Sequence, residues 1–499
     1  MHPLRLPVLL TTLLTRAILS THAAATITVR TSQEFAQAIA TASAGEHIVV
    51  APGQYTLAAT IRVAPLTIEG QSAQDRPVLS IASGSTILTV DSGPVTGISI
   101  QNLVFEGNFQ SITAIRAKAT GVTVQGCGFS NFEGQKDANP IIHFSYDDRG
   151  RGDLMQPCMV GACRFSRAPY TRAIYSLGPT TVEDCTFENI RYSMHLTDIT
   201  GSSASSPRMD YENIVRRNEI YRTEGTAWDC RGIVTKSTAP KIYENRIHDI
   251  TTGGDCEAIA AMGNGLAGTP TRAEIFRNVI IAKWKAADSN LIHEGIEYGE
   301  TPGDHGLIYE NVLVGYLRPG IYNKGDHNRW FNNTSYFTDQ DGYTRHAYGV
   351  GCEYKNNIQV GGWMGVYTAA LVAEKVALGY FPAGSATDFP ALHHTCFWGL
   401  NEAVSTFAEG TGFMREDPKF VDPANLDFHL RWDSPCINAG DGSRDGLTVT
   451  DMGAYEYPIQ VSHFSVNTSG MASWQWHNGF QAVAQRVTCL LYTSPSPRD

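Results

Sequence analysis

The sequence predicts an all-β protein, a right-handed parallel β-helix (a solenoid of stacked coils) with an N-terminal capping helix. The chain of 499 residues has only 17% charged residues and contains 47 glycines, a composition that suits many short strands joined by turns. A short pattern, apolar-x-x-(Asn or Cys)-x-apolar, recurs along most of the chain. Its period varies from one occurrence to the next, whereas helical repeats hold a more constant period.

The repeated pattern has one marked column, which is occupied first by cysteine and then by asparagine. Its members are Cys127, Cys163, Cys185, Asn218, Asn245, Asn278, Asn311, Asn333 and Asn356. The closest spacing is 22 residues, from Cys163 to Cys185, and the widest is 36, from Cys127 to Cys163. The short spacing fits a coil of three strands, and the longer ones fit loops inserted at the corners. We expect the asparagines to form a hydrogen-bonded ladder inside one turn and the cysteines to stack as buried thiols.

Both ends of the chain lie outside the predicted solenoid, which covers residues 26–457 with its cap. Residues 1–25 resemble a secretory signal peptide, with Arg5, an apolar core and small residues at 23–25. Arg16 interrupts the apolar run, so a membrane-spanning helix is not expected. Residues 458–488 are predicted to begin a further module or tail. Residues 489–499 look like a translated sequencing adapter.

Two segments have helical patterns. Thr31-Ser-Gln-Glu34 is a capping-box sequence, and Phe35 and Ile39 belong to one apolar face, which predicts a short helix over the first coil. Residues 366–378 form the other segment with helical composition. The strands are expected to begin near Ile48.

The opening and closing segments carry a family resemblance. Residues 32–70 combine the predicted helix with a "PGQY" turn, and the closing segment contains Asp417-Pro-Lys-Phe-Val-Asp-Pro423 and Ser434-Pro-Cys-Ile-Asn-Ala-Gly-Asp441. These segments resemble the secreted right-handed parallel β-helix proteins of the pectate-lyase-like superfamily over residues 26–457. The resemblance implies the fold. It implies less about chemistry, because this fold hosts lyases, hydrolases, epimerases and adhesins.

The strands that follow the repeat column can be aligned to give one outward row of side chains. The row contains His143, Tyr175, His195, Val234, Ala260, His293 and Tyr322, with Lys236 and Lys324 beside it and Arg345 or His346 on the next coil. A trough lined by His, Tyr and Lys suits an extended polyanionic sugar chain. We expect His143, Tyr175 and Lys236 to bind substrate, and His195, His293 and Tyr322 to be catalytic candidates. One alternative is a solvated sheet face with ordinary polar residues. Separately, a one-residue register slip would turn the row inward.

Lys324 and Arg345 are the sharpest pair in this row, because they are 21 residues apart, about one coil. The segments "NKGDHN" and "YTRHAYG" resemble the chondroitinase-B and alginate-lyase family, where a lysine base and an arginine lie one coil apart. The resemblance implies β-elimination, in which Lys324 removes the proton α to a uronate carboxylate and Arg345 holds that carboxylate. The chain departs from the family where calcium-binding glutamates precede the lysine, because residues 315–321 contain none.

No cofactor is established by the sequence, and calcium is the one candidate. Its possible ligands are Glu294 and Glu297, for which a solvated acidic loop is the alternative.

Composition bounds the function. The net charge of −11 argues against nucleic-acid binding, and ten cysteines, with Cys230 and Cys256 as one possible bridge, fit an exported protein. We therefore expect a secreted, extracellular monomer that binds an acidic polysaccharide and acts as a polysaccharide lyase. Two alternatives stay open. One is a non-catalytic glycan-binding or adhesin β-helix, and the other is a glycoside hydrolase or uronan epimerase.

Overall fold

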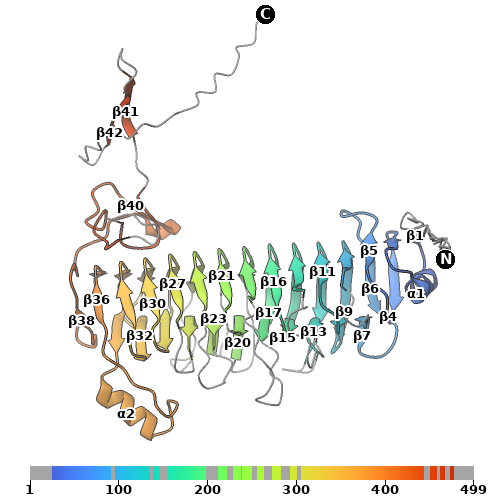
Figure 1. The fold of residues 1–499 in the computed structure, drawn as a ribbon, viewed down its shortest axis with the longest axis horizontal. Helices are drawn as coiled ribbons and strands as arrows, with labels where there is room; N and C mark the ends of the chain where they lie inside the picture. The colour runs from blue at the N-terminus through green and yellow to red at the C-terminus, as the bar shows by residue number, and fades with distance from the viewer. Residues whose placement is uncertain are drawn as a thin grey trace, which may run out of the picture. The chain divides into compact units, whose positions relative to one another are not determined.

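The computed structural model describes residues 25–91, 96–134, 139–145, 156–197, 212–221, 229–237, 239–249, 255–262, 272–282, 293–299, 305–442, 450–457, 461–466 and 472–476. The chain divides into two compact units, residues 1–240 and 241–499. Each unit is a right-handed parallel β-helix whose complete coils contain three strands, as the sequence predicts (Figure 1). Residues 1–24 of the predicted signal peptide and all of 489–499 lie outside the described residues. The predicted domain limits therefore stay predictions.

Unit 1 stacks its strands on three faces. The first face contains β1 (Thr26–Val29), β2 (His47–Val50), β5 (Leu66–Gly70), β8 (Ile98–Gln101), β11 (Val122–Gln125), β14 (Cys158–Gly161), β16 (Thr180–Glu183) and β18 (Ile214–Arg216). The second contains β3 (Gln54–Leu57), β6 (Val78–Ile81), β9 (Val104–Gln110), β12 (Gly128–Phe132) and β19 (Glu219–Tyr221). The third contains β4 (Ala59–Ile61), β7 (Thr86–Val90), β10 (Thr113–Ala117), β13 (Ile142–Phe144) and β20 (Asp229–Lys236). The long strands β15 (Arg164–Ser176) and β17 (Thr186–Thr197) continue from the second face to the third.

The predicted N-terminal helix is α1 (Ser32–Thr41). The Thr31 hydroxyl accepts a hydrogen bond from the Glu34 backbone N–H, which is the first half of the predicted capping box, and the Glu34 carboxylate accepts one from the Arg30 N–H at 2.7 Å rather than from the Thr31 N–H. The buried side of α1 includes Phe35, which meets the ring of Tyr55 edge-on at 5.9 Å. Figure 1 shows α1 beside the first strands of unit 1. Its role as a cap stays a prediction.

Inside unit 1, like residues stack on like residues. The rings of Phe105, Phe129, Phe165 and Phe187 stack in series with centroid separations of 4.7–5.0 Å. The cysteine column is buried as free thiols, and the Cys163 N–H donates to the Cys185 sulfur at 3.4 Å. The predicted thiol stack is therefore present.

Unit 2 repeats the same arrangement. Its first face contains β21 (Lys241–Tyr243), β24 (Glu274–Phe276), β27 (Leu307–Tyr309), β30 (Arg329–Phe331), β33 (Glu353–Lys355), β36 (Ala391–His393) and β38 (Ala408–Glu409). The second contains β22 (Arg246–His248), β25 (Val279–Ala282), β28 (Val312–Gly315), β31 (Thr334–Phe337), β34 (Ile358–Val360) and β37 (Cys396–Trp398). The third contains β23 (Asp255–Ala261), β26 (His293–Tyr298), β29 (Ile321–Lys324), β32 (Tyr343–Tyr348) and β35 (Trp363–Val366).

The asparagine column of unit 2 forms the predicted ladder. The side-chain amide of Asn245 donates to Asn278, Asn278 donates to Asn311, and Asn311 donates to Asn333, each at 3.0 Å. The ladder then continues to Asn357 rather than to the predicted Asn356. The sequence prediction was wrong by one residue at this step, because Asn356 has a left-handed backbone (φ 57°) and its side chain turns to Asn332 instead.

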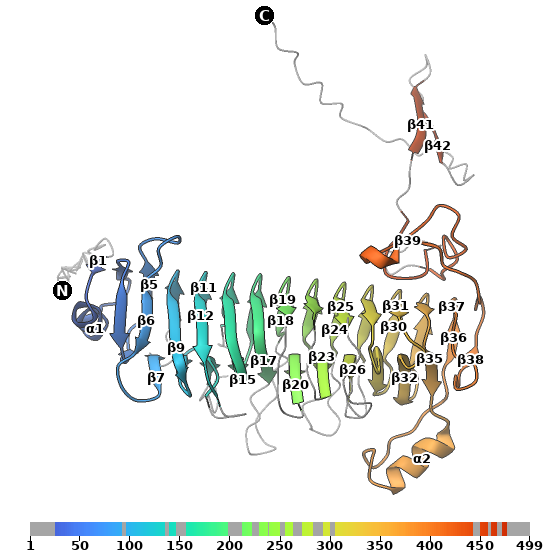
Figure 2. The same cartoon turned by 180° about the vertical axis from the view of Figure 1, so that it is seen from behind.

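Two further segments pack on unit 2. Helix α2 (Ala369–Ala377), predicted within residues 366–378, buries Val372 in a cluster with Ala347 and Tyr348 of β32, so it lies beside the third face. The closing segment contains β39 (Phe420–Asp422), a 3-10 helix (Pro423–Asn425) and β40 (Asp427–Leu430). Its apolar side chains pack on the second face of unit 2. Figure 2 shows β39 near β31 and β37 of that face. A hairpin of β41 (Val461–Val466) and β42 (Ala472–Trp476) follows.

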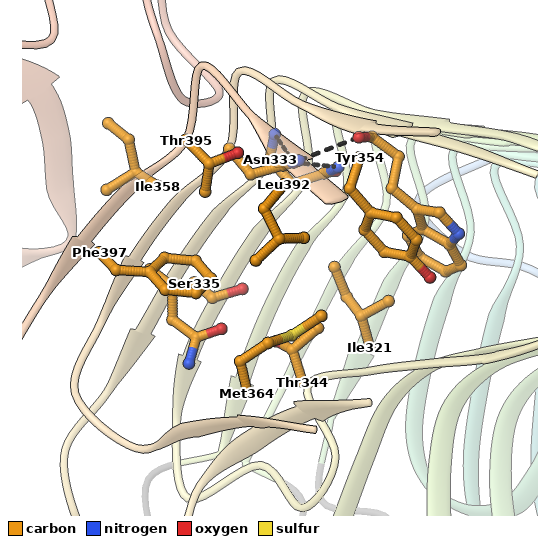
Figure 3. Close-up of a pocket in the computed structure, with 13 residues that line it drawn as sticks. Ile321, Asn333, Ser335, Thr344, Tyr354, Ile358, Met364, Leu392, Thr395 and Phe397 are labelled. Atoms are coloured by element: carbon orange, nitrogen blue, oxygen red, sulfur yellow. Dashed lines mark hydrogen bonds between the residues drawn. The ribbon is translucent and has the colours of Figure 1, made fainter. Parts of the chain in front are cut away.

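The interior of unit 2 contains a small cavity of about 30 Å³ between the faces (Figure 3). Its lining includes the ladder residue Asn333 together with Met364 and Phe397 from two different faces. The cavity has room for about one or two water molecules. It is a packing space rather than a substrate cleft.

We expect the ladder to carry much of the stability of unit 2. Asn278→Ala should lower the free energy of unfolding by about 3 kcal/mol, because it leaves several buried polar partners unsatisfied. Exposed Asn425 is the control, and Asn425→Ala should change the free energy of unfolding by about 0.5 kcal/mol or less. Urea unfolding midpoints measure both values, and equal losses in the two variants would contradict the ladder's role.

Candidate functional site

The third face of unit 2 gathers the sharpest predicted residues. Its strand register places one column of outward side chains in the order Ala260, Glu297, Tyr322, Arg345 and Gly365. Neighbouring parallel strands are about 4.8 Å apart, so successive members of the column can touch. Tyr322 and Arg345 are thus direct neighbours across β29 and β32.

Lys324 lies beside this column and forms an ion pair with Glu297. The lysine side chain is 21% exposed, whereas the Glu297 side chain is only 5% exposed. The Lys324 Nζ is 4.5 Å from the ring centre of Tyr322, and the Arg345 Cζ is 5.8 Å from the same ring centre. The two cations therefore flank one phenol ring. The sequence predicted an exposed lysine, but Lys324 is half-buried because Glu297, one coil away, holds it.

Three carboxylates meet next to Lys324. One oxygen of each of Glu257, Glu294 and Glu297 lies within 4.8 Å of the others, and Glu257 pairs directly with Glu294 across β23 and β26. Glu294 and Glu297 belong to strand β26, so the solvated-loop alternative is wrong for them. An all-oxygen set of this kind suits a hard divalent cation such as calcium.

The charges of this cluster act on its titratable groups. Burial alone would lower the pKa of Lys324, but the charge and hydrogen bond of Glu297, assisted by Tyr322 and Glu294, raise it above its usual value. Burial raises the pKa of Tyr322, and the charges of Lys324 and Arg345 offset part of that rise. At neutral pH the cluster therefore holds an ammonium and an uncharged phenol.

The inward residues of the same strands fix this arrangement. The Asn323 amide donates to His346 Nδ1 at 2.9 Å and accepts from Asn328 at 2.7 Å. His346 Nε2 lies 3.1 Å from the Thr387 hydroxyl, and burial lowers the pKa of His346 to about 4. The neutral ring holds β29 against β32. Of the two candidates that the sequence left open, Arg345 joins the outward column and His346 faces the interior.

Unit 1 has a column of its own on its third face. Its register is Arg116, His143, Tyr175, His195 and Val234. The rings of His143 and Tyr175 are 5.2 Å apart, and those of Tyr175 and His195 are 5.4 Å apart. Within unit 1, these three predicted residues are neighbours in the predicted order.

Cations surround the histidines of unit 1. Burial, together with the charges of Arg172, Lys236 and Arg231, lowers the pKa of His195 to about 3. Burial also lowers the pKa of His143 to about 4, with a contribution from Arg116. Both rings are therefore neutral at physiological pH, and neither is poised near 7 as a general base would be.

The predicted alignment was wrong at His293. Ala260 pairs with Glu297, and Cys256 pairs with His293, so the sequence row was misplaced by four residues on β26. Loops of different lengths separate the coils here, and no repeat marks the strand itself. The His293 side chain lies outside the described part of the structure. Val234 and Ala260, predicted on the exposed row, are fully buried, and each pairs with a larger residue of the neighbouring strand, His195 and Glu297 respectively.

Sequence reasoning missed four residues around the cluster. Glu257 was missed because the predicted alignment of β23 with β26 was displaced by four residues. Tyr343, Trp363 and Tyr367 surround Arg345, with ring centres 4.5–5.3 Å from its Cζ atom. Alternation along β32 could have found Tyr343, which is two residues before Arg345 and shares its face.

Known proteins resemble the chain in fold. No family model matches it, and no curated protein matches its sequence. Among solved structures, a PL6 family polysaccharide lyase from Pseudopedobacter saltans is 13% identical with a TM-score of 0.43, covering 82% of this chain and 97% of that chain. Pectate lyase Pel9A is 13% identical with a TM-score of 0.32, covering 85% and 91%. A mutant of the periplasmic alginate epimerase AlgG is 11% identical with a TM-score of 0.38, covering 78% and 82%. These three proteins are parallel β-helix proteins, as this chain is.

No helix among the described residues is long and apolar enough to cross a membrane. Cys230 and Cys256 are both disulfide-bonded, whereas the other seven described cysteines are free and buried.

The buried histidines predict a pH dependence of stability. The folded pKa values of His195 and His143, about 3 and about 4, lie below the unfolded value of about 6.5. Between these limits the unfolded state binds more protons, so this contribution to stability falls as the pH is lowered from about 6.5 towards 4. His195→Gln should flatten the decrease in urea midpoint between pH 7 and pH 5. An unchanged pH profile in the variant would show that His195 titrates normally.

Proposed function

We propose that the chain is a secreted polysaccharide lyase that cleaves an acidic, uronate-containing glycan by β-elimination. The observation that carries the proposal is the grouping of Lys324, Tyr322 and Arg345, with both cations flanking one neutral phenol. Elimination needs a base for the proton α to the carboxylate, positive charge for the resulting enolate, and an acid for the leaving oxygen. The disulfide-bonded Cys230 and Cys256 support export.

Each side chain has a role in this chemistry. Arg345 stabilises the negative charge that develops on the uronate, because a guanidinium stays protonated at any working pH. Tyr322, whose raised pKa keeps it protonated, can donate a proton to the leaving oxygen. Lys324 acts as the base once its ammonium group has released a proton. This release requires that another cation pair with Glu297 in place of Lys324.

We also propose that Glu257, Glu294 and Glu297 bind calcium. Their oxygens converge within 4.8 Å, and calcium prefers such carboxylate ligands. A bound calcium ion would supply positive charge to the substrate carboxylate and to the enolate. Glu297 would then exchange its partner, and the pKa of Lys324 would fall towards the range where it can accept a proton.

We propose that the column of unit 1 is a glycan-binding surface of that unit. His143, Tyr175 and Lys236 offer ring faces and charge on one face of that unit. Replacement of His143 is expected to weaken the binding of long chains more than that of short ones.

A second candidate function is non-catalytic glycan binding by the same face. One observation favours it: Lys324 is engaged by Glu297, and its raised pKa opposes a role as a base. The ultraviolet absorbance of the unsaturated uronate product, measured over a panel of polyuronates, distinguishes an enzyme from a binding protein.

Lys324→Ala should lower elimination by about 10²–10⁴-fold, the usual contribution of a general base. It should also lower the free energy of unfolding by about 2–3 kcal/mol, because Glu297 is left buried without its cation. The double variant Lys324→Ala/Glu297→Gln separates the two effects, since it should recover stability without recovering activity. Lys375→Ala on α2 is the matched control and should retain activity. Full activity of Lys324→Ala on a verified substrate would exclude Lys324 as the base.

Calcium removal provides an independent test of the carboxylate cluster. A chelator should abolish most of the elimination, and added calcium should restore it. Glu257→Gln should raise the calcium concentration needed for half-maximal activity, because it removes a charged ligand that does not contact Lys324 in this structure. Activity that is unaffected by chelation would exclude the proposed calcium site while leaving the roles of Lys324 and Arg345 open to the first test.

A further inference from the structure

Arg345 lies within a group of aromatic rings on the third face of unit 2. Its Cζ atom is 4.5 Å from the ring centre of Tyr343 and 5.3 Å from those of both Trp363 and Tyr367. Tyr322 lies on the remaining side at 5.8 Å. Each distance is within the range of cation–π attraction. None of these ring contacts is a hydrogen bond, so they do not use the N–H groups of the guanidinium as donors to a described acceptor.

The rings are themselves braced. Tyr343 and Trp363 stack across β32 and β35 with their centres 4.4 Å apart and their planes inclined by 26°. The indole of Trp363 lies over Gly365, where an added Cβ would come within 2.7 Å of its six-membered ring. Tyr367 stacks on Phe381, which also contacts Tyr348 beneath α2. Tyr343, Trp363 and Tyr367 are only partly buried, so they form a partly exposed aromatic platform.

Arg345 also differs from other arginines of unit 2 in its partners. Arg329 pairs with Glu353, and Arg318 pairs with Asp341. Among the residues that the structure describes, Arg345 has no carboxylate within ion-pair distance, and its buried Nε atom has no hydrogen-bond acceptor. A buried donor without an acceptor costs about 1–3 kcal/mol.

We propose that Arg345 and the platform of Tyr343, Trp363 and Tyr367 form a subsite that recognises one carboxylated sugar. The guanidinium receives the planar carboxylate through two parallel N–H···O bonds, and Trp363 receives the apolar face of the sugar ring. The subsite selects a carboxylated sugar over its neutral counterpart before any chemistry takes place. This inference rests on the proposed function, since it takes a uronate as the substrate class.

Binding without turnover tests the subsite directly. The Lys324→Ala/Glu297→Gln background prevents elimination, so affinity electrophoresis in gels that contain polygalacturonate or polymannuronate reports binding alone. The same polymers after reduction of their carboxyl groups are the neutral probes. We expect retardation by the polyuronates and at least about ten-fold weaker binding to the reduced polymers.

Substitutions in that background separate charge from ring. Arg345→Lys should weaken polyuronate binding about ten-fold, because a point charge cannot make the bidentate contact. Trp363→Ala should weaken it by a similar factor. Gly365→Ala removes no functional group but displaces the indole, so it should also weaken binding. Trp398→Ala and Trp432→Ala remove exposed tryptophans elsewhere in unit 2 and should bind like the parent. Thermal unfolding of each variant verifies that it is folded.

Different results overturn different proposals. Equal binding of reduced and unreduced polymers, or parental binding by both Trp363→Ala and Gly365→Ala, would exclude the subsite and leave the test of elimination untouched. Conversely, binding that depends on Arg345 and Trp363 in a protein with intact Lys324 that forms no unsaturated product would support the subsite. That second result would exclude the lyase.

Discussion

The interior asparagine ladder is the constraint on which the rest of unit 2 depends. Each ladder amide donates to the next asparagine and to backbone carbonyls, so a coil that slipped by one residue would leave several buried polar groups unsatisfied. The ladder therefore fixes the register of each coil on its neighbour. The ladder stacks successive coils one above another, and the strands of the third face then pair along the same stack in a register of their own.

The candidate site follows from this alignment and from the cost of burying charge. Glu297 is 4% exposed, and a carboxylate at that depth needs a cation. Lys324 supplies it, and the pKa of the lysine rises as a result. The arrangement is stable but unsuited to proton abstraction until Glu297 acquires another partner. The Lys324–Glu297 ion pair thus stabilises the fold but keeps Lys324 protonated. The neighbouring Glu257 and Glu294 lie where they could help bind a second cation, which would pair with Glu297 instead.

The sequence predicted the parts of the structure that repeat. The asparagine pattern located the coils, and the one-coil separation of Lys324 and Arg345 located their strands. The alignment of strands from the sequence failed where the segments between the repeats differ in length. Ala260 and Glu297 are 37 residues apart, whereas Tyr322 and Arg345 are 23 apart, so counting could not decide whether His293 or Glu297 entered the column. The sequence pattern also missed that the ladder continues to Asn357 rather than Asn356. The two asparagines are adjacent, so the pattern does not distinguish them.

Lys324 and Arg345 lie in different electrostatic environments, and we infer different roles for them from this difference. Lys324 is neutralised by a buried carboxylate, so its charge is already satisfied within the protein. Among the described residues, Arg345 contacts aromatic rings and has no carboxylate within ion-pair distance, and rings attract a cation without neutralising it. Its positive charge is therefore not neutralised by any described carboxylate. A polyanionic ligand would gain more from Arg345 than from Lys324, so we infer that recognition begins at the aromatic platform and that proton transfer depends on the carboxylates one coil away.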